Sequence, residues 1–231
     1  NGGSNPAPTL PTGLVAGDLM ITFAYTRENV DGTISISAGW TELYNNRAGG
    51  GLFAAWRWVF VAGDGAPTLT LGNHVGGASG DTAGAQIAAW SGVDQTTPLG
   101  TLGTLGNFAS AQDIGAIAGI TIGANDAVVV MGGKRDDWTS VATLTGDGLT
   151  WNEVGEPDST SGADAGLVWD YAIDGGGGTT VTAKKFTVTG GAAATSRGAM
   201  LELNVAAVAA EDLATKRLEI GLSGMIQITG G

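Results

Sequence analysis

The chain has 231 residues, of which 41 are glycine and none is cysteine, and its formal net charge is −12. The lack of cysteine excludes disulfides, thiolate nucleophiles and cysteine-ligated metals. The acidic balance disfavours nucleic acid and anionic lipid as partners, because both are bound through basic surface, and no apolar run reaches the ~20 residues of a membrane-spanning helix.

The N-terminal arm, residues 1–11, is rich in glycine and proline and is expected to be extended. Short apolar or alternating runs follow, separated by Gly, Asp and Pro turns, and this pattern is typical of β-strands. Seven tryptophans and these runs argue against disorder. In the first part of the chain, strands are predicted over residues 19–25, 33–37, 40–44, 52–61, 68–71 and 85–90.

Residues 99–111 are expected to connect two parts of the chain, and no helical period stands out in either part. In the second part, strands are predicted over residues 120–122, 127–131, 149–154, 165–173, 179–183, 186–188 and 199–203. The C-terminal arm, 205–231, is expected to hold a short helix, because acidic residues precede basic ones over 211–217 as the helix dipole favours.

The sequence repeats its own order of elements. The segment around Trp40 reappears around Trp151, and the segment around Trp56 reappears around Trp169, at offsets of 111 and 113 residues. These paired tryptophans are expected to pack in the core. Two long copies do not make a solenoid, so we expect one all-β, jelly-roll-like β-sandwich with extended arms at both termini. Its two similar halves are expected to span about residues 12–100 and 112–204.

The sequence offers few residues suited to catalysis. His74 is the single histidine, which excludes multi-histidine metal sites and leaves a Ser-His-Asp triad dependent on one loop residue. Glu28 and Asp136 occupy matching positions and offer the carboxylate pair of a glycoside hydrolase. Each follows an arginine, however, which favours ordinary loop ion pairs. We therefore expect no enzymatic activity.

Glycine-rich loops contain the acidic residues that suit a structural calcium ion, since hard cations prefer oxygen ligands. Asp-Gly is also the ordinary hairpin-turn dipeptide, so the two interpretations stay open, and no other cofactor or metal is expected. The residues concerned are Asp64, Asp147, Asp164 and Asp174.

A candidate glycan site lies in the polar stretch Arg135-Asp136-Asp137-Trp138, which has no matching tryptophan in the first half. β-Sandwich lectins stack sugars on exposed tryptophan, so Asp136, Asp137 and Trp138 are the predicted ligand-binding residues. The alternative is that the Trp138 ring folds back over the core.

The segment Leu218–Thr229 lies outside the repeat and reads as an additional strand. Such a strand pairs with an edge of its own sandwich or with a neighbouring subunit. We expect the contact with a neighbour, through the apolar side chains Leu218, Ile220, Leu222, Met225, Ile226 and Ile228.

Three stretches carry a resemblance to a known family: Val15-Ala16-Gly17-Asp18-Leu19, Gly39-Trp40-Thr41-Glu42-Leu43, and Ala88-Ala89-Trp90-Ser91-Gly92-Val93-Asp94 with Thr96-Thr97-Pro98. Over about residues 12–204 the chain resembles a widespread family of β-sandwich proteins encoded by tailed bacteriophages and prophages. The resemblance implies a jelly-roll-like sandwich with a role in assembly or adhesion, and it supplies no catalytic residues.

The predicted function is that of a non-enzymatic structural protein of an extracellular particle, in the first place a phage virion, as a head-decoration or tail component. Its partners would be further copies of itself or neighbouring virion proteins, and its location the virion or the cell exterior. The alternatives are a carbohydrate-binding or receptor-binding module, which adds a cell-surface glycan as partner, a subunit of a prokaryotic surface filament, and a glycoside hydrolase.

Overall fold

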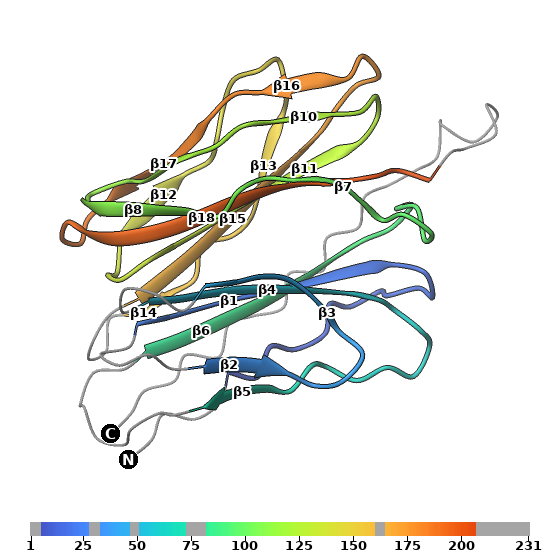
Figure 1. Ribbon diagram of the computed structural model, residues 1–231, viewed down its shortest axis with the longest axis horizontal. Coiled ribbons are helices and arrows are strands. Elements are labelled where there is room, and N and C mark those ends of the chain that lie inside the picture. The colour runs from blue at the N-terminus through green and yellow to red at the C-terminus, as the bar shows by residue number, and fades with distance from the viewer. Residues whose placement is uncertain (1–5, 28–32, 47–50, 73–81, 160–164, 207–231) are drawn as a thin grey trace.

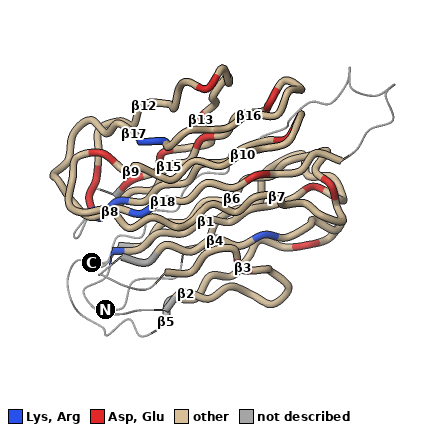
Figure 2. The backbone as a smooth tube through the Cα atoms, turned by 45° about the horizontal axis from the view of Figure 1, so that its top comes forward, with Lys and Arg blue, Asp and Glu red and all other residues tan. Residues whose placement is uncertain are grey.

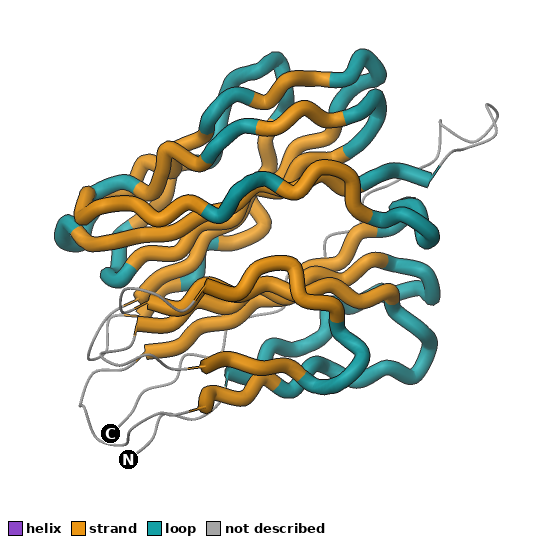
Figure 3. The backbone as a smooth tube through the Cα atoms, in the orientation of Figure 1, coloured by secondary structure: helices purple, strands orange, loops and turns teal. Residues whose placement is uncertain are grey.

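The computed structural model describes residues 6–27, 33–46, 51–72, 82–159 and 165–206. These ranges contain strands and loops and no helix (Figure 3), so the all-β prediction is confirmed. No helix able to cross a membrane is found within them. Two central sheets face each other, and a smaller layer covers the outer side of each (Figure 1).

The first central sheet is antiparallel with the order β3-β4-β1-β6. The second has the order β13-β15-β11-β18-β7, with β14 added on β15 and β8 added on β18. The strands of the first sheet are β1 (Leu19–Arg27), β3 (Thr41–Asn46), β4 (Gly51–Val59) and β6 (Thr82–Trp90). Those of the second are β7 (Leu99–Leu102), β8 (Gly106–Ala111), β11 (Ala127–Lys134), β13 (Trp151–Gly155), β14 (Asp158–Ser159), β15 (Ala165–Ile173) and β18 (Ala194–Leu203).

Smaller sheets form the two outer layers. The two-stranded sheet of β2 (Thr33–Ile36) and β5 (Leu69–Gly72) covers the first central sheet. The second central sheet is covered by β9 (Ile114–Ile117), β10 (Ile120–Ile122), β12 (Ser140–Ala142), β16 (Thr179–Val181) and β17 (Lys184–Thr189).

The two central sheets share a pairing order. The succession β3-β4-β1-β6 of the first sheet corresponds, strand for strand in chain order, to β13-β15-β11-β18 of the second. The central strands β1 and β11 are buried along nearly their whole length, because both faces of each sheet are covered. The shared pairing order therefore agrees with the repeated order of elements in the sequence.

The main core lies between the central sheets and contains Phe23, Phe53, Trp90 and Trp169. A second core fills the space between the second sheet and its cover, and smaller clusters lie on the outer side of the first sheet. Trp56, Trp151 and Trp169 are buried as expected, while their partner Trp40 is half-buried against these outer clusters.

The connection between the two parts differs from the expectation. Residues 99–111 were expected to form a plain link, but they contain β7 and β8, which pair with the outer edge of β18. Their side chains are largely exposed, so no apolar pattern marks them in the sequence. Pairing with β18 holds this stretch against the second sheet, and Leu99, Leu105 and Phe108 also pack against the cores.

Candidate functional site

The predicted glycan residues lie in the loop after β11, but the Trp138 ring is turned inward. Trp138 is 6% exposed and belongs to the second core, its ring lies against Gly166, and its Nε1 donates to the Glu156 carbonyl at 3.2 Å. The structure therefore places the ring as a core residue, the alternative that the sequence left open, and presents no stacking face of it to solvent.

The neighbouring Asp136 carboxylate holds the same loop in place. Asp136 accepts a hydrogen bond from the Ala192 backbone N–H and lies 3.9 Å from Lys134 Nζ. Lys134 is fully buried, which lowers its pKa, and its ammonium has no hydrogen-bond partner. Burial of this cation costs free energy, and the charge of Asp136 offsets part of that cost.

The aspartates considered for calcium accept hydrogen bonds from the chain itself. Asp174 accepts four backbone N–H groups and the Thr179 hydroxyl, which hold the pKa of its carboxyl far below the usual range. Asp64 accepts the Trp58 indole N–H at 2.6 Å and the Val61 N–H at 2.7 Å. Across the described ranges no three His, Cys, Asp or Glu residues come together as a metal site.

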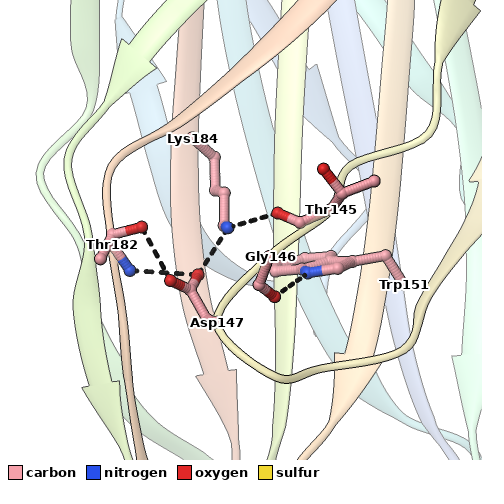
Figure 4. Close-up of polar contacts among 6 residues, drawn as sticks. All are labelled: Thr145, Gly146, Asp147, Trp151, Thr182 and Lys184. Carbon is pink, nitrogen blue, oxygen red and sulfur yellow. Dashed lines mark hydrogen bonds and ion pairs between the residues drawn. The ribbon is translucent and has the colours of Figure 1, made fainter.

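Asp147 forms a nearly buried ion pair with Lys184 beside Trp151 (Figure 4). Lys184 Nζ lies 2.5 Å from Asp147 Oδ2, donates to the Thr145 carbonyl at 2.7 Å, and sits 5.1 Å from the Trp151 ring centroid. Burial by itself raises the pKa of Asp147, but the bonds from Lys184 and Thr182 hold it below its usual value. This cluster joins the β12–β13 loop to the start of β17.

Two further carboxyl sites are buried. Burial raises the pKa of Asp170 to about 7, while Leu144 N–H donates to its Oδ2 at 2.6 Å. At the end of β18, burial raises the pKa of Asp126, whose Oδ1 accepts the Val205 N–H at 2.8 Å. The neighbouring Glu202 accepts the N–H groups of Thr101 and Gly123, and these outweigh burial and lower its pKa.

Sequence reasoning missed a cluster of positive charge between the ends of the central sheets. Arg27, Arg135 and Arg197 lie within electrostatic range of Tyr25, whose pKa is raised by burial. Arg197 is 6% exposed and donates through Nη1 to the Asn46 carbonyl at 2.9 Å. Arg27 ends β1, Arg135 follows β11 and Arg197 lies in β18, so the three come from distant parts of the sequence and form no local motif.

The charged residues of the described chain lie mostly at strand ends and in turns (Figure 2). Several residues named from the sequence fall outside the described ranges, namely Glu28, His74, Asp164 and the C-terminal arm from residue 207 with its expected helix and its strand residues Leu218 to Ile228. In comparisons with protein-family models, curated proteins and solved structures, nothing matches the chain.

The polar groups of the described chain are thus used mainly to fix loops and strand ends. Carboxylates bind backbone N–H groups of their own turns, and buried cations bind nearby acids or carbonyls. These contacts hold turns and strand ends of the described chain in place.

Proposed function

We propose that the protein is a non-enzymatic structural component of an extracellular particle, with a phage head-decoration or tail protein as the specific form. The phage assignment rests on the resemblance of residues 12–204. Under this proposal the sandwich is a rigid building block, found in the virion or outside the cell, and its partners are its own copies or neighbouring virion proteins.

The observation that carries the proposal is that polar side chains form hydrogen bonds within the chain, which fix turns and strand ends around the apolar cores. Asp174 alone takes up the N–H groups of Gly176, Gly177 and Gly178 in one turn. Turns fixed in this way hold the loops of a glycine-rich, cysteine-free chain in one conformation. A fixed conformation suits a subunit that assembles in many copies.

The proposed assembly device is the C-terminal arm, with Leu218–Thr229 as the strand that a neighbour receives. The test compares the mass of the full chain with that of a chain ending at residue 206, by light scattering at several concentrations. The full chain is expected to self-associate and the shortened chain to remain monomeric with the same circular dichroism spectrum. Equal masses for the two chains at every concentration would count against the arm as the assembly device.

A further inference from the structure

The strand β6, at one edge of the first central sheet, lacks the features that keep edge strands from pairing with other chains. Its nine residues contain no proline and no charged residue. Its register against β1 runs without a shift from Thr82 opposite Arg27 to Trp90 opposite Leu19. Edge strands are normally protected by charges, prolines or bulges, so β6 is an uninterrupted and unprotected edge.

The opposite edge of the same sheet, β3, is protected. The exposed Glu42 lies on it, the register against β4 shifts between Glu42 and Tyr44, and Asn46 Nδ2 donates to Asn107 Oδ1 at 3.2 Å. A bulge and a charge therefore discourage pairing at β3. The difference between the two edges indicates that β6 is the one suited to a partner.

The second central sheet has a filled edge at the corresponding place. β18 occupies the position in its sheet that β6 occupies in the first, and its outer edge is paired with β7 and β8. Within the ranges that the structure describes, β6 pairs with β1 alone. The correspondence with β18 therefore places a further strand beside β6.

Both faces of β6 are already in use. Ala88 and Trp90 pack into the main core, while Ile87 and Ala89 pack on the outer side against Leu10 and Leu14. In an antiparallel pair only alternate residues bond to the partner strand, so the remaining N–H and C=O groups of β6 point outward. A strand is the partner that satisfies such a row of backbone groups.

We propose that the edge of β6 accepts the C-terminal strand Leu218–Thr229 of a neighbouring copy. This inference rests on the proposed function and names the strand that accepts the C-terminal arm. The described chain ends beside the turn that follows β6, because Val205 bridges Val93 and Ala206 N–H donates to the Gly92 carbonyl at 2.9 Å.

The length and composition of the arm suit this role. Residues 207–217 span at most about 36–40 Å when extended, which lets the following strand leave its own sandwich for an adjacent one. The segment Leu218–Thr229 carries a single charged residue, Glu219, and is long enough to run the length of β6. An apolar, nearly uncharged strand matches an acceptor edge that is itself uncharged.

The test uses hydrogen exchange of single backbone amides in the full chain, measured above and below the concentration at which it associates. The variant Ile220→Pro with Leu222→Pro removes two N–H donors and blocks strand pairing, while Gly230→Pro, beyond the strand, is the matched control. Neither variant touches the described cores, which contain no residue after Leu203.

The outward amides of β6 are expected to be protected in the associated full chain and in Gly230→Pro, and to lose protection on dilution and in the double-proline variant. Protection that persists in the diluted monomer but disappears with the prolines would assign the edge to the chain's own arm and overturn the neighbour as occupant. If association depends on residues 220 and 222 while the β6 amides stay unprotected, the acceptor lies elsewhere, although the proposed function stands. Association that is insensitive to the prolines would overturn the C-terminal strand as the assembling element, and with it this inference, and would leave the proposed function to be carried by another surface.

Discussion

Trp90 and Trp169 meet edge to face between the two central sheets, with ring centroids 5.8 Å apart and planes at 74°. Trp90 ends β6 and Trp169 lies in the middle of β15, so the pair joins the two sheets. Trp169 also donates its indole N–H to Gln86 Oε1, another residue of β6. One side chain thus supplies both apolar contact and a buried hydrogen bond across the main core.

Replacing Trp169 with alanine is expected to lower the free energy of unfolding by about 3–5 kcal/mol, because it leaves a cavity beside Trp90 and strips Gln86 of its partner. Urea denaturation of the variant and of the parent chain measures the loss. Trp40→Ala, at a half-buried tryptophan, is the control and should cost clearly less. An equal loss in both variants would contradict the central role of Trp169.

The Lys184–Asp147 pair predicts strong coupling between two substitutions. Lys184→Met leaves the Asp147 carboxylate nearly buried without its cation, and breaking a buried pair in this way costs about 3–5 kcal/mol. The double variant Lys184→Met with Asp147→Asn is expected to recover much of that loss, since no charge is then left unpaired. A double-mutant cycle measured by denaturation gives the coupling, and additive losses would argue against the pair.

Asp170 predicts that stability falls as pH rises. Its folded pKa of about 7 lies above the ordinary value of 3.8, so between these values the folded state keeps a proton that the unfolded state has released. The contribution of this group is therefore lost as pH rises through 7, by an amount on the order of 4 kcal/mol.

The measurement for Asp170 is the free energy of unfolding from pH 4 to pH 9 in the parent chain and in Asp170→Asn. The asparagine keeps an oxygen for the Leu144 N–H but does not titrate. The free energy of unfolding of Asp170→Asn minus that of the parent chain should increase with pH. This increase distinguishes Asp170 from carboxylates of lowered pKa such as Asp174. A difference that stays constant with pH would show that Asp170 is ionised throughout.

Strands with buried side chains could be predicted from the sequence. The run 165–173 was expected to be a strand over its whole length and forms β15 with the same bounds, because continuous burial leaves an apolar signature. β7 and β8 were missed for the opposite reason. Their side chains are largely exposed, and pairing with β18 sets where they begin and end, so their sequence shows no clear strand pattern.

The polar interior was harder to predict than the sheets. Lys134 lies three residues beyond the predicted strand 127–131, yet it ends β11 and is fully buried, within the range of the Asp113 charge. Trp138 stood in a polar stretch, but its ring reaches the core across Gly166. In both cases a segment distant in sequence buries the side chain, and the composition of the neighbouring residues gives no sign of it.

Close approach of aromatic rings to glycines gives a fourth prediction. A Cβ at Gly133 would run into the Tyr25 ring, which is itself buried between the sheets and has no room to move. Gly133→Ala is therefore expected to destabilise the fold by about 1–3 kcal/mol through overpacking. Gly177→Ala is the matched control, because a Cβ there meets nothing within 4 Å. Thermal melting of both variants tests the difference, and equal melting temperatures would contradict it.

Trp138 gives the last prediction, because its two interpretations lead to different results. As a core residue, Trp138→Ala should cost about 3–5 kcal/mol of unfolding free energy. Trp138→Phe should cost less, since the phenyl ring keeps most of the contact with the core and loses the hydrogen bond to the Glu156 carbonyl. Asp137→Ala, at the half-buried neighbour, leaves the core untouched and serves as the binding control. Denaturation and glycan-array binding are measured on the parent chain and on all three variants. Loss of stability without any glycan signal in the parent chain fits a core role. Glycan binding by the parent that disappears in Asp137→Ala at unchanged stability would instead restore this loop as a ligand site.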